Sequence, residues 1–166
     1  MIRTGAVDVD YPESGGGRAA LVVGALPGFV VAEEHVAWLD TVEPYVPGEF
    51  YRRELPAIRA VLAGVAAVEL LIVDGYVDLD PDGRPGLGAH VHEALGIPVI
   101  GVAKTSFRSA THAVPVLRGV ATKPLFVTAV GVSRAEAAAY VLGMSGAYRM
   151  PEALRRVDAL ARGRGH

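Results

Sequence analysis

The sequence predicts an α/β protein built on one mixed sheet, with an antiparallel three-strand meander followed by parallel strands and helices on both faces. Residues 6–38 contain strand-like segments without helical periodicity, whereas helical spacing and buried apolar runs alternate after residue 55. Apolar residues make up 51% of the chain and charged residues 20%, which is typical of a globular protein. At 166 residues, we expect one domain over residues 1–166.

The first three strands are expected close together in the sequence. AVDVDY (6–11) is typical of a short strand, and RAALVVGAL (18–26) and FVVAEEHVAW (29–38) predict a hairpin joined at Pro27-Gly28. The three segments together predict the antiparallel meander.

A helix and two buried strands are expected next. LPAIRAVLAGV (55–65) has apolar residues at three- and four-residue intervals, and its Pro56 is tolerable only in the first turn of a helix. ELLIVDG (69–75) and PVIGVAK (98–104) are apolar runs typical of strands buried on both faces. The breaker-rich loop 78–86 and a helix over 87–95 would connect these strands by a right-handed crossover.

The last part of the chain predicts one strand and two helices. KPLFVTAVG (123–131) is expected at an edge of the sheet. Ser133 and Glu136 form a capping-box pair at the start of a helix, and a final helix runs from Pro151 to a stop at Gly163. We therefore expect about five or six strands and three or four helices.

Composition excludes several classes of site. The chain has no cysteine, so disulfides and thiolate metal sites are excluded and Asp, Glu and His are the remaining candidate ligands. The N-terminus does not resemble a signal peptide and no apolar run approaches membrane-spanning length, so we expect a cytoplasmic protein without membrane contact.

A net charge of −2 argues against a nucleic-acid binder, unless the acids gather at a metal ion and the bases line a groove around it. An ordinary solvated surface is the alternative. Candidates for the groove are Arg52, Arg53, Lys104, Arg108, Arg118, Lys123, Arg155, Arg156, Arg162 and Arg164.

Two carboxylates lie inside apolar strands, Asp8 in AVDV and Asp74 in LLIVDG. A buried carboxylate must be paired, protonated or metal-bound. If the two strands are neighbours, the Cα atoms lie only about 5 Å apart, and a divalent cation would relieve the repulsion. Glu54 and Asp158 could add further oxygen ligands, which favours Mg²⁺ or Mn²⁺ and phosphodiester hydrolysis.

Each acid also has an ordinary explanation. An Asp at a strand end commonly caps a turn, Glu54 could pair with Arg52 or Arg53, and Asp158 could pair with Arg162 at helical spacing. Lys104, at the end of GVAK, either neutralises charge at a phosphate or leaving oxygen, or extends to solvent at the sheet rim.

Six motifs follow one another along the chain: the VDV strand, PYVPGEFYRRE (44–54), LLIVDG (70–75), GLGAH (86–90), IPVIGVAK (97–104) and YRMPEALRRVDALA (148–161). Together they resemble the endonuclease V family, the metal-dependent nucleases of deaminated-base repair. The resemblance covers about residues 5 to 162. It implies a ribonuclease-H-like fold.

The resemblance also implies a reaction and a set of site residues. It implies nicking of one strand of inosine-containing DNA or RNA at the second phosphodiester bond on the 3′ side of the inosine. Independently of the resemblance, we expect the protein to be a monomer. A stiff loop would be pushed into the duplex as a wedge while the inosine base flips into a pocket. The residues implied are Asp8, Glu54 and Asp74 for Mg²⁺ and catalysis, Lys104 for catalysis, Asp158 at the metal, Tyr45, Val46, Pro47 and Gly48 for the wedge, and Gly75 for the base pocket.

The chain departs from the family pattern after LLIVDG. The family continues G-H-G-x-x-H-P-R-R, but this chain has YVDLDPDGRP, with one extra residue and Asp80 where a functional His is expected. Asp80 could add a metal ligand or repel the phosphate backbone. The chain is also short for the family, and Val130-Gly131-Val132 replaces an expected Gly-His.

Two other functions remain open. The first is a nucleic-acid-binding module on the same scaffold with weak or no cleavage, as suggested by the missing His and the acidic loop. The second is a small-molecule-binding domain in which GGG (15–17) or VVGALPG (22–28) cradles a phosphate, but neither glycine cluster opens a helix after a buried strand.

Overall fold

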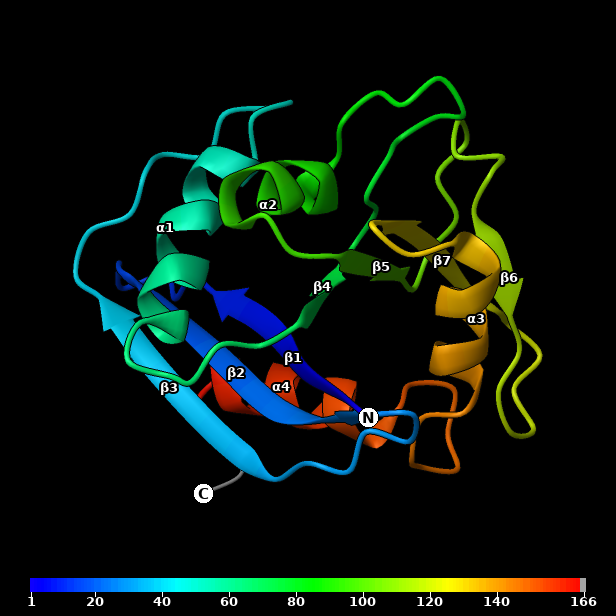
Figure 1. Ribbon diagram of the computed structural model, residues 1–166. Coiled ribbons are helices and arrows are strands. Elements are labelled where there is room, and N and C mark those ends of the chain that lie inside the picture. Colours follow the sequence, from blue (N-terminus) through cyan, green and yellow to red (C-terminus); the bar gives the residue numbers. More distant parts are fainter. Residues whose placement is uncertain (165–166) are drawn as a thin grey trace.

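The computed structural model describes residues 1–164, which form a seven-stranded mixed sheet in the order β3-β2-β1-β4-β5-β7-β6, flanked by helices (Figure 1). The strands are β1 (Ile2–Asp10), β2 (Gly17–Leu26), β3 (Glu33–Leu39), β4 (Leu70–Asp74), β5 (Val99–Ala103), β6 (Val114–Val116) and β7 (Leu125–Val130), and the helices are α1 (Tyr51–Leu62), α2 (Leu87–Leu95), α3 (Arg134–Leu142) and α4 (Glu152–Ala161). The predicted fold class is confirmed.

The predicted meander is present, with β2 antiparallel to both β1 and β3. The predicted strand 29–38 is wrong in its first residues, because β3 begins only at Glu33. The chain turns at Gly28, and Phe29, with φ of 48°, inserts its side chain into the core, where it is 1% exposed. Burial of the Phe29 ring therefore determines the backbone conformation here and overrides the strand propensity of the segment.

The parallel centre of the sheet brings the two acidic strand positions together. β1 pairs with β4 in a register that sets Ala6 opposite Ile72, and Asp8 and Asp74 each follow two residues later. β5 extends the parallel arrangement on the other side of β4. The first and fourth strands are therefore neighbours, which is the condition that the metal-site hypothesis required, and both acids lie at the carboxyl ends of these parallel strands.

The far side of the sheet differs from the prediction. β7 pairs with β5 on one side and β6 on the other, so the segment 123–131 does not lie at an edge. The edge is β6, which the sequence did not reveal because it has three residues and the middle one is Pro115. A proline is tolerated there because an edge strand needs fewer backbone donors.

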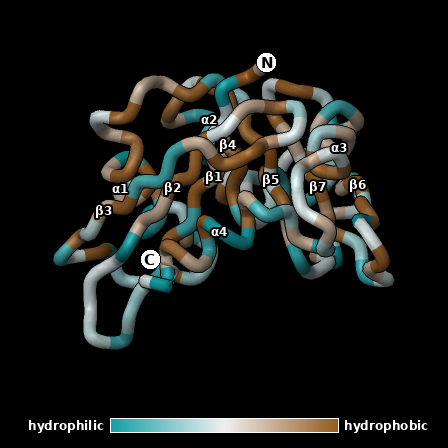
Figure 2. The backbone as a smooth tube through the Cα atoms, turned by 90° about the horizontal axis from the view of Figure 1, so that it is seen from below, coloured by the Kyte–Doolittle hydropathy of each residue, from teal (hydrophilic) through white to brown (hydrophobic). Residues whose placement is uncertain are grey.

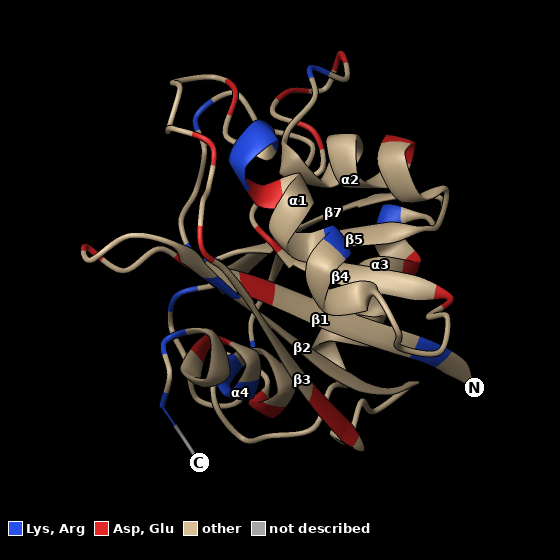
Figure 3. Ribbon diagram, turned by 90° about the vertical axis from the view of Figure 1, so that its left-hand side faces the viewer, with Lys and Arg blue, Asp and Glu red and all other residues tan. Residues whose placement is uncertain are grey.

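Helices cover both faces, as predicted. α1 and α2 pack on one face through residues such as Ile58 and Val91, and α3 and α4 pack on the other through residues such as Val141 and Val157. Figure 3 shows α1 and α4 on opposite sides of the strands, and Figure 2 shows apolar residues concentrated along the central strands. No helix within residues 1–164 is long and apolar enough to cross a membrane.

The helix α1 begins at Tyr51, four residues before the predicted start. Glu54 therefore lies in its first turn, and Pro56 lies in the second turn, contrary to the expected first-turn position. The missing N–H of Pro56 removes one helical hydrogen bond. Helix α2 matches the predicted range 87–95, and the N-cap of α3 forms as expected, with the Ser133 hydroxyl accepting from the Glu136 N–H at 3.1 Å.

Candidate active site: an acidic furrow at the carboxyl ends of β4 and β5

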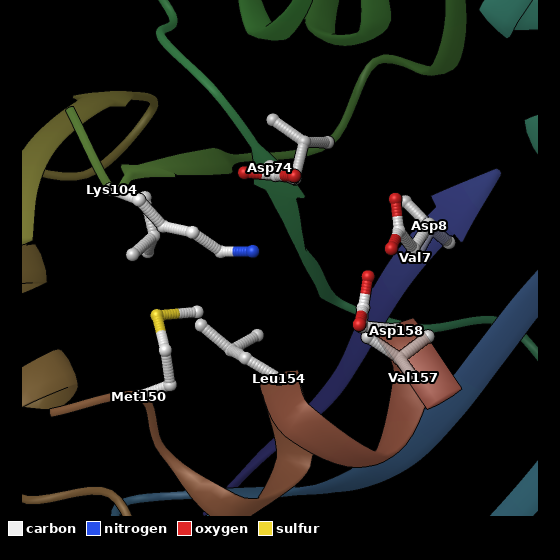
Figure 4. Close-up of a pocket in the computed structure, with 10 residues that line it drawn as sticks. Val7, Asp8, Asp74, Lys104, Met150, Leu154, Val157 and Asp158 are labelled. Atoms are coloured by element: carbon white, nitrogen blue, oxygen red, sulfur yellow. The ribbon is translucent and has the colours of Figure 1, made fainter. Parts of the chain in front are cut away.

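Four predicted acids from four different elements line one pocket: Asp8 on β1, Glu54 on α1, Asp74 on β4 and Asp158 on α4. A second hollow shares Asp8, Asp74 and Asp158 and continues to Lys104 and the N-terminal part of α4 (Figure 4). We call the two hollows together the acidic furrow. Among its other lining residues are Phe50 and Arg162 at one end, and Met150 and Leu154 at the other.

Asp8 has the most strongly perturbed carboxyl group of the furrow. Burial first, then repulsion by Asp74 and a hydrogen bond with Asp158, raise the pKa of Asp8 to about 8. The side chains of Asp8 and Asp158 face one another in Figure 4. A carboxyl group in this position favours its protonated form unless a cation offsets the charge.

Glu54 is 6% exposed, and burial raises its pKa to about 7. It accepts a hydrogen bond of 2.5 Å from the Tyr11 hydroxyl. The alternative pairing with an arginine is not observed, because Arg52 pairs with Glu49 at 3.4 Å and the Arg53 guanidinium lies 3.6 Å from the centre of the Tyr11 ring. Glu54 is thus hydrogen-bonded to a neutral partner, and the nearby charge of Arg53 offsets only part of the cost of its burial.

Asp74 and Lys104 face each other across the furrow. Desolvation raises the pKa of Asp74, and the nearby Lys104 ammonium lowers it in part. Lys104 follows β5 directly, and its ammonium group points toward Asp74 in Figure 4. The lysine therefore points into the furrow, in the position expected for a group that neutralises charge there.

Asp158 combines the two explanations that the sequence left open. It pairs with Arg162 one turn later on α4, at 3.1 Å, as the ordinary explanation requires. It also lines the furrow opposite Asp8. The ion pair holds the Asp158 carboxylate at the mouth of the furrow without removing it from the site.

The donor types of the furrow suit a hard divalent cation, since all four acids offer carboxylate oxygens and the pKa values of Asp8, Glu54 and Asp74 are raised. Within residues 1–164, however, no three Asp, Glu or His side chains are arranged so that they could hold one ion. The expectation that the acidic oxygens already meet at one point is therefore not confirmed. The carboxylates share a furrow but do not form a closed ligand set.

The loop containing Tyr45, Val46, Pro47 and Gly48 stands at the Phe50 end of the furrow. Tyr45 is 58% exposed, and its ring packs edge-on against Phe50 with 6.1 Å between ring centroids. The Glu49 N–H donates to the Val46 carbonyl at 2.9 Å, which closes a turn in which Gly48 has φ of 82°. The loop is thus a turn with an exposed aromatic side chain beside the acids.

Gly75 follows Asp74 with φ of 120°, and its N–H donates to the Val102 carbonyl at 2.9 Å. Apart from Gly75 itself and its two neighbours in the chain, no residue has an atom within 4 Å of the position that a Cβ at Gly75 would occupy. The backbone here is fixed by β5 while the space beside it is open.

Asp80 does not contribute to the furrow. Its carboxylate accepts from the N–H groups of Asp82 and Arg84 at 3.0 and 3.1 Å, so it closes its own polar loop. It does not line either hollow of the furrow. Of the two roles left open for Asp80, the structure favours neither.

Sequence reasoning missed Tyr11, which binds Glu54, and Phe50, which supports Tyr45. Tyr11 follows the Asp8 strand, and Phe50 lies between the glycine of the turn and the helix, so both were adjacent to predicted residues. Only their partners, which lie elsewhere in the chain, reveal what they do.

Two neighbouring parallel strands end in acids, and a helix on each face of the sheet adds one further acid. This arrangement is that of the ribonuclease-H-like nucleases. A profile of the Endonuclease V family matches residues 2–119. The chain belongs to the Endonuclease V family.

Relatives and solved structures agree with this assignment. Endonuclease V of Streptomyces coelicolor is 35% identical, over 96% of this chain and 78% of the relative. The crystal structure of Endonuclease V from Streptomyces avermitilis superposes with a TM-score of 0.80 at 31% identity, covering 97% of this chain and 80% of that one. Ciona intestinalis Endonuclease V, solved with a 23mer DNA containing an inosine followed by a ribo-adenosine, has the same fold, with a TM-score of 0.82, 20% identity, and coverage of 97% and 84%.

Proposed function

We propose that this protein is a divalent-metal-dependent endonuclease that acts as a monomer and nicks inosine-containing DNA or RNA at the second phosphodiester bond on the 3′ side of the inosine. The observation that carries the proposal is that Asp8, Glu54, Asp74 and Asp158 line one furrow. Of these four acids, only Asp158 forms an ion pair with an arginine among residues 1–164. The Ciona relative, solved with inosine-containing DNA, supports the choice of substrate.

The four carboxylates would hold Mg²⁺, or alternatively Mn²⁺. When bound, the cation would supply charge stabilisation at the scissile phosphate and an activated water. Asp8 and Asp74, the acids at the two strand ends, would bind it in their ionised form. Glu54 would be oriented by its hydrogen bond from Tyr11.

Lys104 would act on the leaving group. Hydrolysis breaks the bond between phosphorus and the 3′ oxygen and leaves 3′-hydroxyl and 5′-phosphate ends. An ammonium group beside Asp74 would stabilise negative charge on the phosphate or on that departing oxygen. The role needs an ammonium that reaches into the furrow, and Lys104 has that orientation.

The Tyr45 loop would enter the duplex beside the lesion. A turn stiffened by Pro47 loses little entropy on insertion, and the exposed Tyr45 ring can stack on a base that has lost its partner. The open space beside Gly75 would admit the flipped base.

The test is an end-labelled oligonucleotide with one inosine, incubated with Mg²⁺ and resolved against a size ladder. We expect one product, at the second phosphodiester bond, and no product from the matched guanosine oligonucleotide. Asp74→Asn should reduce the rate at least about a hundredfold. Tyr45→Ala should slow nicking of duplex about tenfold and of single strands less, because only the duplex must be opened.

A second candidate is a nucleic-acid-binding module with weak or no cleavage. It is favoured by the lack of a closed ligand set among residues 1–164 and by Asp80 in place of a His. Tight binding of the inosine oligonucleotide without product under Mg²⁺ or Mn²⁺ would support this module and contradict the endonuclease.

A further inference from the structure

An exposed tyrosine and an exposed arginine form a pair at the Lys104 end of the furrow. Tyr148 is 66% exposed, and the guanidinium carbon of Arg155 lies 4.7 Å from the centre of its ring. No carboxylate of residues 1–164 lies within ion-pair distance of Arg155, whereas the next residue, Arg156, is paired with Glu34. The charge of Arg155 is therefore not neutralised by a neighbouring acid.

The position of the pair follows from α4. Leu154 and Met150 line the furrow beside Lys104, and Arg155 and Tyr148 are their near neighbours in the chain. Arg155 also precedes Asp158 by three residues, which places both on one side of the helix. The Tyr45 loop lies at the other end, where Phe50 and Arg162 line the furrow, so the two exposed tyrosines flank the acids from opposite ends.

The backbone that carries Tyr148 is firmly held. Arg118, predicted for a basic groove, is instead 4% exposed, and its guanidinium donates to the carbonyls of Met144, Gly146 and Tyr148 at 2.5, 2.9 and 2.7 Å. The next residue, Arg149, donates to the carbonyls of Lys123 and Pro124 at 3.0 and 2.8 Å. An aromatic ring on a fixed backbone loses little entropy when a base stacks on it.

We propose that Tyr148 and Arg155 form a second contact for the nucleic-acid strand, on the far side of the scissile phosphate from the Tyr45 loop. This inference rests on the proposed function. The Tyr148 ring would stack on an unpaired base, and the Arg155 guanidinium would bind an adjacent phosphate. The exposed Lys123, whose backbone is tied to Arg149, adds a positive charge nearby.

The test uses the full chain and single-stranded inosine oligonucleotides that extend about ten nucleotides on both sides of the nick, or are cut to about two on one side. Dissociation constants come from fluorescence anisotropy in Ca²⁺, and nicking rates from Mg²⁺ reactions. We expect the double variant Tyr148→Ala, Arg155→Ala to weaken binding roughly tenfold for oligonucleotides that are long on the 3′ side of the nick, the side away from the inosine. Oligonucleotides shortened on that side should bind both proteins equally.

The matched control is Arg156→Ala, which removes the same charge from the adjacent residue of the same helix. It should leave the length dependence unchanged, whereas Arg155→Ala alone should reduce the slope of log Kd against log salt concentration by about one. Tyr148→Phe should retain the stacking and bind like the unchanged protein, which separates stacking from loss of folding.

Equal weakening at every length, or no weakening at any, would overturn the contact even if the unchanged protein nicks inosine normally. Conversely, a length-dependent loss of binding in a protein that never nicks would support the contact and contradict the proposed endonuclease. The two proposals can therefore fail separately.

Discussion

The acids of the furrow and the acids of β3 are in opposite electrostatic situations on the same sheet. On β3, Glu33 pairs with Arg3 at 2.6 Å and with His35 at 3.1 Å, and these contacts lower the pKa of Glu33 to about 2. In the furrow, burial raises the pKa of Asp8 to about 8 and of Glu54 to about 7. The paired Glu33 favours the folded state when ionised, whereas Asp8 and Glu54 oppose it.

This difference indicates which acids stabilise the fold and which are placed to bind a ligand. A side chain that costs stability in the free protein is expected where function needs it. Asp8, Glu54 and Asp74 have that property, and the acids of β3 do not.

The largest effect is expected when one acid of the furrow and one acid of β3 are each replaced by the corresponding amide. Asp8→Asn should reduce nicking at least about a hundredfold, yet at about pH 8 raise the Tm of the metal-free protein by about 3 °C or more, because it removes a carboxyl group whose ionisation the folded state opposes. Glu33→Gln should leave nicking unchanged and lower the Tm. Calorimetry and the nicking assay check both, and a lower Tm for Asp8→Asn would contradict the electrostatic account.

The pH dependence of stability tests the same contrast without mutation. Because the folded pKa values of Asp8 and Glu54 lie above the ordinary carboxyl value, their stabilising contribution is complete below about pH 4 and is lost as the pH rises to about 8. Urea unfolding in EDTA should give a free energy of unfolding roughly 1–3 kcal/mol higher at pH 5.5 than at pH 8.5.

Glu33 acts in the opposite direction and in another range. Because the pKa of Glu33 is lowered, its ionised carboxylate stabilises the folded state at pH values above the ordinary glutamate pKa. That contribution is lost as the pH falls toward about 2.

The opposite result for the furrow would contradict the contrast. A free energy of unfolding that stays flat or rises between pH 5.5 and 8.5 would show that ionisation of Asp8 and Glu54 does not destabilise the folded protein.

An added divalent cation should offset the destabilisation of the folded protein by the ionised carboxylates of the furrow. At pH 8, Mg²⁺ or Mn²⁺ at about a hundred times its Kd should stabilise the folded protein by about 2.7 kcal/mol, seen as an increase in Tm. The increase should be smaller at pH 5.5, since protons compete with the cation, and absent in Asp8→Asn. An equal increase in Asp8→Asn would place the cation outside the furrow.

The smallest effect is expected at the second arginine pair of β3. Arg156→Ala removes the partner that lowers the pKa of Glu34, but both side chains are partly exposed and screened by water. We expect a Tm decrease of at most about 2 °C in calorimetry and no change in nicking. A large loss of activity would assign Arg156 to the substrate surface.

Regular elements were predictable where local signals agree. The helix 87–95 was found with its predicted bounds, since helical spacing ends at Gly96, which adopts the left-handed conformation of a C-cap. Strand β6 was not found, because three residues around Pro115 carry no periodicity. The strand predicted from residue 29 began too early, because Phe29 packs into the core away from the ladder.

The site was predictable in its acids but not in their partners. Asp8 and Asp74 were recognisable as charges inside apolar strands, but that these strands are neighbours was only a condition of the metal-site hypothesis, and the pairing of β1 with β4 meets it. The contact of Tyr11 with Glu54 spans 43 residues, and the burial of Arg118 depends on carbonyls about 30 residues away. No local pattern encodes such contacts.

Residue order alone established the α/β alternation, the placement of acids at strand ends and the membership of a nuclease family, because apolar periodicity and short motifs are local properties of a chain. Folding established which charges are neutralised, which arginine is buried and which aromatic rings flank the furrow. Those outcomes depend on distance and desolvation between remote segments, and these quantities exist only once the sheet and its helices have assembled.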